Sequence, residues 1–318
     1  MQRPAFRQPH FAVQDAPELL DAWHASASRL AQLADITKEL PDWVACAAVS
    51  GSLARMESHP KSDVDLLLVV DDRQTTVTAD QAADVHNDVW NRLEKIGAVR
   101  PKAGGIFSCC ARWKDLVELS SRGRIDEDIL TFGHRIQLLL DSQPVCHNNR
   151  FIELQRDILQ WYSEVRLAAA FGETGPFHWL WQDVQRYWRS LRARTCWLYP
   201  DDEARSVTLN VKLRSSRLML IFAFLKSLQE VQQTAQPLPQ QIDYTIALLH
   251  ETPVERLFGQ SNVLTHWNLI WSWLRDQSVA PVAAVPADVL SGLRELAIGV
   301  RESIAEGSSG DQSLMWIL

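Results

Sequence analysis

Two aspartates separated by a single residue, Asp63 and Asp65, have the types and spacing best suited to chemistry in this sequence. They precede and open an apolar run, Leu66–Val70, whose composition is typical of a buried strand. Because side chains two residues apart in a strand point to the same side, we expect the two carboxylates to lie together. Close carboxylates repel each other, and a cation relieves that repulsion. Hard oxygen ligands of this kind favour Mg²⁺ or Mn²⁺, so the pair predicts a metal site.

Gly51 and Ser52, which come before the aspartate pair, have the properties of a phosphate-binding turn. Glycine permits unusual backbone angles and lets a ligand approach the chain closely. The N–H groups that follow the glycine, together with the Ser52 hydroxyl, can hold phosphate oxygens. A glycine turn that faces a carboxylate pair therefore indicates a site for a metal ion and a triphosphate.

Two short buried strands and the loop between them must position these residues. The apolar run Val44–Val49 predicts the first strand, which the Ser50-Gly51-Ser52 sequence ends, and Leu66–Val70 predicts the second. The polar loop carries Arg55 and Lys61. Either cation could contact the triphosphate, and Arg55 is the candidate nucleotide-binding residue of the two. The alternative, which we favour, is that both are solvated loop charges.

The strand, the Gly-Ser pair, the loop of about ten residues and the Asp-x-Asp strand together resemble the signature of the polymerase β-like nucleotidyltransferases. The Ser-Asp-Val-Asp-Leu form, which begins at Ser62, is similar to that of bacterial small nucleotidyltransferases and of the uridylyltransferase domains that modify PII signalling proteins. The motif covers Val49–Val70, a vaguer likeness extends to about Val145, and a faint one reaches the regions of Asp183 and Lys212. The alternative is a β-hairpin in which two aspartates cap a strand by chance.

The resemblance implies an α+β fold in two parts. Residues 13–145 would form a nucleotidyltransferase domain with a small mixed β-sheet, and residues 146–318 an α-helical domain that closes the cleft and selects the acceptor. The implied activity is transfer of a nucleoside monophosphate from a nucleoside triphosphate, with ATP expected, to an acceptor hydroxyl with release of pyrophosphate. The acceptor, a small molecule or a protein, stays open.

The resemblance also implies roles for the residues of the motif. Asp63 and Asp65 would be the catalytic ligands of Mg²⁺ or Mn²⁺, while Gly51, Ser52 and Ser62 would contact the nucleotide.

A third carboxylate accompanies the pair in many relatives, where it completes the metal site or deprotonates the acceptor hydroxyl. Asp126, in a predicted loop before a helix, is our first choice. Glu118 is a candidate if its segment is a strand, and Asp128 is another, although an acid at that position more commonly caps a helix. A site without a third carboxylate is the remaining alternative.

Helical periodicity defines most other elements of the sequence. In the first part it predicts helices over 17–40, 78–96 and 129–140, with a third strand over 106–111. In the second part it predicts helices over 151–171, 178–198, 207–232, 240–250, 261–277 and 287–305.

Two of these later helices carry candidate nucleotide-binding residues. Relatives commonly place a helical domain across the catalytic cleft, where a lysine, a tyrosine or a serine meets the nucleotide. Lys212 precedes a strongly apolar run, and Tyr187 shares a helix face with Asp183 and Arg186. The alternative is that the charged residues form surface salt bridges and the tyrosine is part of the core.

Composition bounds the class of protein. The chain has 318 residues, of which 46% are hydrophobic, enough for two domains of ordinary size. The net charge of −7 disfavours nucleic acid as a partner, although a local basic patch is compatible with it. Five cysteines without CxxC spacing predict a reducing cytoplasm and no zinc site. No apolar run approaches the ~20 residues of a membrane span, and the N-terminus lacks the apolar region of a signal peptide, so no membrane partner is expected.

Two other functions are compatible with the same motif. A non-catalytic nucleotide-binding module would keep the site and transfer nothing, and the lack of a third carboxylate would favour it. A toxin-like enzyme that modifies tRNA would require a basic groove. The residues available for such a groove are Arg186, Arg189, Arg192, Arg194, Lys212, Arg214 and Arg217.

Overall fold

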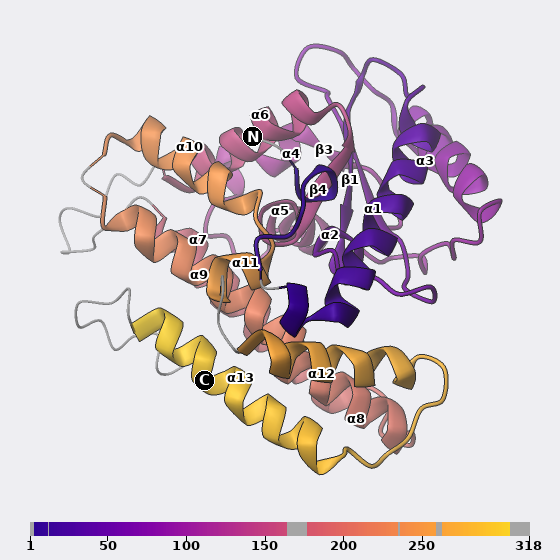
Figure 1. Ribbon diagram of the computed structural model, residues 1–318. Helices are drawn as coiled ribbons and strands as arrows, with labels where there is room; N and C mark the ends of the chain where they lie inside the picture. Colours follow the sequence, from indigo (N-terminus) through magenta and orange to yellow (C-terminus); the bar gives the residue numbers. More distant parts are fainter. Residues whose placement is uncertain (1–2, 12, 164–176, 235, 259–262, 306–318) are drawn as a thin grey trace. The chain divides into compact units, whose positions relative to one another are not determined.

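The computed structural model in Figure 1 describes residues 3–11, 13–163, 177–234, 236–258 and 263–305. The described chain forms two compact units. The first takes Arg3–Phe6 and the described part of Trp23–Arg166, and the second takes Arg7–Ala22 and the described part of Leu167–Leu318. A small mixed sheet in the N-terminal part is followed by helices, which confirms the predicted α+β class.

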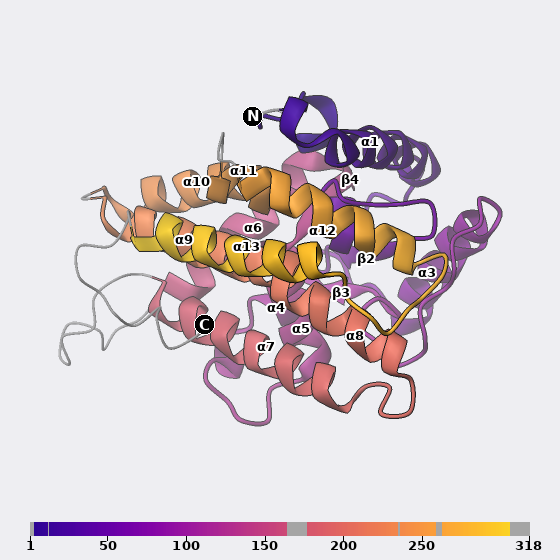
Figure 2. The ribbon, with the colours of Figure 1, turned by 60° about the horizontal axis from the view of Figure 1, so that its bottom comes forward.

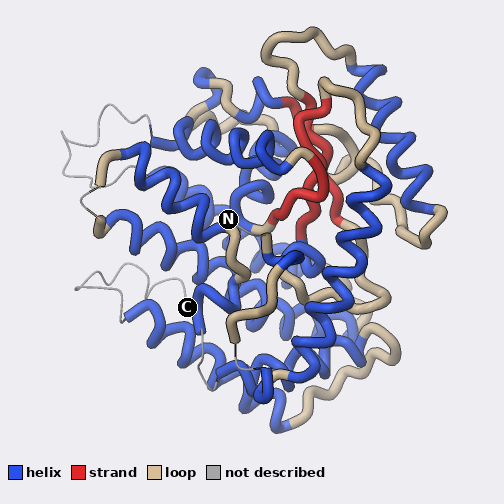
Figure 3. The backbone as a smooth tube through the Cα atoms, turned by 45° about the horizontal axis from the view of Figure 1, so that its top comes forward, coloured by secondary structure: helices blue, strands red, loops and turns tan. Residues whose placement is uncertain are grey.

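A mixed four-stranded sheet lies in the first unit, and Figure 3 shows its strands in red. Its strands are β1 (Val44–Ser50), β2 (Asp65–Val70), β3 (Ala111–Arg112) and β4 (Ser142–Cys146), in the order β3-β2-β1-β4. The central strand β1 is antiparallel to β2 and to β4, whereas β2 and β3 are parallel. Every residue of β1 is buried, as expected for a strand covered on both faces. The predicted strands 44–49 and 66–70 are thus confirmed.

The predicted third strand over 106–111 is wrong, because Ala111 is the only residue of that range that lies in a strand. Residues before Ala111 form turns, and the carbonyls of Ile106 and Phe107 contact imidazole nitrogens of His134 and His86 at 2.5 and 3.1 Å. These side-chain contacts replace a strand ladder, which an apolar run alone does not reveal.

The sequence did not predict the fourth strand, β4, which follows helix α5 (Ile129–Leu140). Pro144, which indicates the end of a helix in sequence, lies inside β4 at the edge of the sheet. Proline is tolerated there because one side of an edge strand needs no ladder hydrogen bonds.

Six α-helices contribute to the first unit, and α5 and α6 pack on β1 and β4. The helices are α1 (Pro17–Thr37), of which only the part from Trp23 belongs to this unit, α2 (Gly51–Ala54), α3 (Ala79–Glu94), α4 (Trp113–Leu116), α5 (Ile129–Leu140) and α6 (Asn148–Ser163). Short 3-10 turns cover Pro4–Phe6 and Leu119–Ser121. The predicted helices 17–40, 78–96 and 129–140 are therefore confirmed to within a few residues. The part of the predicted helix 151–171 beyond residue 163 lies outside the described residues.

The second unit is helical. It contains the 3-10 turn Val13–Asp15 and helices α7 (His178–Trp197), α8 (Glu203–Lys212), α9 (Leu218–Gln232), α10 (Leu238–Leu249), α11 (Pro253–Phe258), α12 (Val263–Gln277) and α13 (Ala287–Ala305). Helix α9 is buried on nearly every side, which identifies it as the core helix of this unit. Helices α12 and α13 lie side by side in Figures 1 and 2 and pack together. The predicted helix 207–232 is interrupted by a π-helical turn, Leu213–Arg217, and the short α11 was not predicted.

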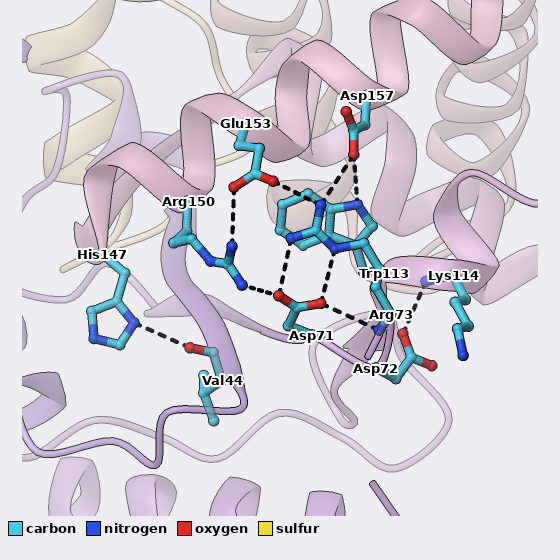
Figure 4. A network of polar contacts seen from close by, with 10 residues as sticks. All are labelled: Val44, Asp71, Asp72, Arg73, Trp113, Lys114, His147, Arg150, Glu153 and Asp157. Carbon is cyan, nitrogen blue, oxygen red and sulfur yellow. Dashed lines mark hydrogen bonds and ion pairs between the residues drawn. The ribbon is translucent and has the colours of Figure 1, made fainter. Parts of the chain in front are cut away.

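A network of ion pairs lies at the end of β2 that is remote from Asp65 (Figure 4). Arg73 donates to both oxygens of Asp71, at 2.9 and 3.0 Å, and its guanidinium lies 3.7 Å from the centre of the Trp113 ring. Arg150 also contacts Asp71, and Glu153 accepts from both arginines. Every charge of this network is paired within the unit, so this end of the strand has a structural role.

None of the helices in the described ranges combines the length and the apolar character that crossing a bilayer would require.

Candidate active site

Gly51 and Asp65 are brought into direct contact by the pairing of β1 with β2. Asp65 lies opposite Ser50 in the ladder, and Gly51 follows Ser50 as the first residue of α2. Gly51 has φ +75°, and a Cβ atom placed on it would lie 2.6 Å from Asp65 Oδ2. The left-handed backbone and this close approach both require glycine. The Gly-Ser turn and one predicted metal ligand therefore share one end of the sheet.

Asp63 and Asp65 are both accessible to solvent and flank a buried residue. Val64 between them is buried, whereas Asp63 is exposed and Asp65 is partly exposed. This alternation is that of an extended chain, although β2 itself begins at Asp65. Burial lowers the pKa of the nearby Arg29 guanidinium, and the negative charge of Asp63 opposes that shift. Asp63 thus faces both solvent and a cation of α1.

Ser52 and Ser62 flank the carboxylates at the two ends of the connecting loop. Ser52 is partly exposed in the first turn of α2, where the helix supplies no acceptor for its N–H groups. The Ser62 hydroxyl accepts from the N–H of His59 at 3.0 Å, and the Ser62 carbonyl accepts from Arg29 at 2.8 Å. Their predicted contacts with a nucleotide stay predictions.

The first part of the loop between the two strands, residues 53–58, is buried, contrary to the expectation of a solvated charge at Arg55. Arg55 is only 6% exposed, with Nε 3.0 Å from Glu57 Oε2 and Nη1 2.5 Å from Asp141 Oδ2. The Ser58 N–H donates to the hydroxyl of Ser26 on α1 at 3.0 Å. Arg55 therefore stabilises the loop from within, and its predicted contact with the triphosphate stays a prediction. Lys61, by contrast, is exposed as expected.

Asp141 is the site residue that the sequence did not reveal. Its carboxylate is fully buried and accepts a hydrogen bond from the N–H of Gly51 at 3.1 Å, in addition to the ion pair with Arg55. The only sequence signal is an acid directly after the apolar run that ends α5. Such a residue is commonly paired when it is buried, but its partners lie about ninety positions earlier in the chain.

The candidate third carboxylates make other contacts. Asp126 is exposed and paired with Arg124 at 2.6 Å, and this hydrogen bond lowers the pKa of Asp126. Glu118 caps a 3-10 turn, and Asp128 caps α5, the more common role for an acid there. Among the described residues, no three or more His, Cys, Asp or Glu side chains form a group that could hold a metal ion. The carboxylates that the structure associates with Gly51 are Asp65 and Asp141.

The candidates of the second unit lie on α7 and at the end of α8. Tyr187 is partly buried in α7, where Arg186 lies 3.5 Å from Asp183. Lys212 is exposed and immediately precedes the π-helical turn, a type of irregularity that is frequent at functional sites. Contacts of Tyr187 and Lys212 with a nucleotide stay predictions.

Comparison with known protein families agrees with this geometry. Residues 8–119 match the family model described as "Putative nucleotidyltransferase DUF294". The matched range contains the Gly-Ser turn and both aspartates of the Asp-x-Asp motif. The match supports a nucleotidyltransferase-like superfamily, which confirms the resemblance found from the motif, and it suggests a transferase. Searches of curated proteins and of solved structures gave no match.

Proposed function

We propose that the protein is a metal-dependent nucleotidyltransferase that moves a nucleoside monophosphate from a nucleoside triphosphate, with ATP expected, to an acceptor hydroxyl. The observation that carries this proposal is the position of the Asp65 carboxylate against Gly51, the residue before Ser52, in a segment where Asp63 and Asp65 alternate with the buried Val64. Carboxylates that would hold a divalent cation and a turn that would hold phosphate are thereby adjacent. The family match to residues 8–119 supports the same class.

The donor set fits Mg²⁺ or Mn²⁺. Both ions prefer oxygen ligands, and Mg²⁺ is commonly bound by one or two carboxylates together with substrate phosphates. Asp63 and Asp65 supply two carboxylates, so a third protein ligand is not required for binding. When bound, such an ion supplies positive charge that stabilises the phosphate oxygens and lowers the pKa of the acceptor hydroxyl.

The chain's own groups would orient the reactants of this step. Ser52, through its N–H and hydroxyl, is proposed to hold the triphosphate, and Asp63 and Asp65 would hold the divalent cation that the phosphate oxygens also bind. The acceptor oxygen attacks the α-phosphorus, the bond from that phosphorus to the bridging oxygen of the β-phosphate breaks, and pyrophosphate leaves. The acceptor proton passes to solvent or to a carboxylate base. Lys212 and Tyr187 are proposed to contact the nucleotide from the helical part.

The test uses the whole chain with each nucleoside triphosphate labelled at the α-phosphate, Mg²⁺ or Mn²⁺, and a cell lysate as the source of acceptors. We expect label to appear in one class of molecule with stoichiometric release of pyrophosphate. Asp65→Asn protein serves as the matched control, because it removes one anionic ligand and keeps the side-chain shape. Release of pyrophosphate that is equal in the variant would contradict the assignment of the site.

A second candidate function is a nucleotide-binding module that transfers nothing. It is favoured by one observation: the described residues bring no third carboxylate into a metal-binding group with the Asp-x-Asp pair. The same experiment distinguishes the two functions. A module of this kind would bind the metal–triphosphate complex without releasing pyrophosphate from any triphosphate in any lysate.

A further inference from the structure

Asp141 holds the backbone of the Gly-Ser turn from the side opposite the Asp-x-Asp motif. Its oxygen Oδ2 accepts from the N–H of Gly51 at 3.1 Å and from Arg55 Nη1 at 2.5 Å, and its side chain has no solvent exposure. On its other side, the α-carbon of Gly51 borders Asp65 Oδ2 so closely that no Cβ would fit. Gly51 is therefore fixed between two carboxylates, of which one is buried and one is partly exposed.

Arg55 fixes Asp141 in turn. The guanidinium lies in the interior with Nη1 directed at Asp141 and Nε at Glu57, so its orientation is set by two carboxylates. Charge-assisted hydrogen bonds of this kind are shorter and stronger than neutral ones, and the planar guanidinium gives them direction. The main chain is held as well: the side-chain amide of Gln143 donates to the carbonyl of Ala54, at the end of α2, at 2.8 Å. The turn has little freedom to move without breaking these contacts.

We propose that Asp141 is a positioning residue of the nucleotide site. Through its hydrogen bond with Gly51, it fixes the positions of Asp65 and of the Ser52 groups that would bind phosphate. This inference rests on the proposed function. A buried carboxylate that served only the stability of the fold could bind any part of the loop. Asp141 instead binds the N–H of Gly51, a residue that also borders the predicted metal ligand. Outer residues that orient metal ligands in this way typically affect metal affinity when they are changed.

The chain offers a matched control for the loss of a buried carboxylate. In the second unit, Glu255 Oε2 accepts from the N–H of Thr252 at 2.8 Å and from Arg7 Nη2 at 2.7 Å, and the Glu255 side chain is 2% exposed. Asp141 and Glu255 thus both accept from a backbone N–H and from an arginine, and Glu255 also accepts from the N–H of His10 and from the hydroxyl of Thr252. Glu255→Gln removes the same charge from the same kind of pair, at a place with no contact to the Gly-Ser turn among the described contacts.

The experiment compares wild-type protein with Asp141→Asn, Glu255→Gln and Arg55→Lys, all as the full chain. Three quantities are measured: the melting temperature, the dissociation constant of Mn²⁺ with a non-hydrolysable ATP analogue by electron paramagnetic resonance, and the Gly51 amide resonance in protein labelled with ¹⁵N-glycine. For Asp141→Asn we expect a shifted Gly51 amide and a Mn²⁺ dissociation constant raised about 10-fold or more. For Glu255→Gln we expect a lower melting temperature with unchanged Mn²⁺ binding.

Arg55→Lys keeps the inference testable if Asp141→Asn does not fold. Lysine keeps the charge but cannot direct two separate donors at Asp141 and Glu57, so Mn²⁺ binding should weaken again. Unchanged Mn²⁺ binding in every folded variant of Asp141 or Arg55 would overturn the positioning role and leave the proposed function intact. A wild-type protein that binds neither Mn²⁺ nor the analogue would overturn the proposed function itself, and the two failures are thereby distinct.

Discussion

Replacing Gly51 with alanine probes the contact between the Gly-Ser turn and Asp65 most directly. The residue has φ +75°, and a left-handed conformation destabilises a residue with a Cβ by about 1–2 kcal/mol. The new Cβ would also lie 2.6 Å from Asp65 Oδ2, which no pair of unbonded atoms of this kind tolerates. The carboxylate is the movable end of a side chain, so Asp65 would rotate away rather than the backbone. Gly51→Ala therefore combines a modest loss of stability with displacement of a predicted metal ligand.

Gly97 provides the matched control for this substitution. It lies in the same unit with φ +83°, and a Cβ placed on it meets nothing within 4 Å. Gly97→Ala should therefore reduce the free energy of unfolding by a similar ~1–2 kcal/mol without moving Asp65. The difference between the two variants isolates the effect of the displaced carboxylate from that of backbone strain.

The assays are urea denaturation for stability and pyrophosphate release for transfer, at a temperature where both variants are folded. We expect Gly51→Ala to lower the rate of transfer by about 100-fold or more, equivalent to ~2.7 kcal/mol of transition-state stabilisation, and Gly97→Ala to leave it unchanged. Equal rates in the two variants at equal folded fraction would refute the argument that Asp65 and the Gly-Ser turn form one site.

Three further predictions concern other parts of the chain. Asp65→Asn should abolish transfer while the melting temperature stays the same or rises, because a repelling charge is removed; a variant with full activity would contradict the metal site. Lys212→Ala should raise the KM for the triphosphate about 10-fold, or ~1.4 kcal/mol, with partial recovery in Lys212→Arg; an unchanged KM would place Lys212 away from the nucleotide. The hydrogen bond from Arg73 lowers the pKa of Glu153 below its ordinary 4.5, so this pair stabilises the protein above that pH and loses its effect as the pH falls through the lowered pKa. Unfolding curves should be measured between neutral and acid pH. The free energy of unfolding should fall less on acidification in Glu153→Gln than in the wild type, and equal decreases would contradict a role of this pair in the pH dependence of stability.

Local sequence patterns predicted the part of the site that is local in the chain. The two apolar runs, the glycine between them and the Asp-x-Asp spacing are all contained in about twenty-five residues, and each obeys a short-range rule of strand or turn geometry. The antiparallel pairing of the two strands does not follow from these patterns, because the connection over residues 51–64 is long enough for either direction. The contact of Gly51 with Asp65 nevertheless agrees with an expectation drawn from spacing alone.

Patterns of hydrophobicity could not predict the elements whose identity depends on distant partners. The segment over 106–111 is apolar enough for a strand, but its carbonyls contact histidines of α3 and α5 instead. The segment after α5 contains a proline and polar residues, yet it completes the sheet because β1 offers it a free edge. In both cases the tertiary environment determined the backbone, which a single sequence does not record.

Arg55 and Asp141 show the same limit at the site itself, because the local sequence around each residue does not indicate its partner. An arginine four residues after a phosphate-binding glycine suggests a phosphate ligand, whereas an acid directly after an apolar helix has no specific meaning in the sequence. In the folded chain each satisfies the other, 86 positions apart, with Glu57 as the second carboxylate. Arg55 thereby joins two carboxylates of the interior, and Asp141 joins this pair to the N–H of Gly51. Gly51 also borders Asp65, so contacts that no local pattern records connect distant parts of the chain to the proposed metal site.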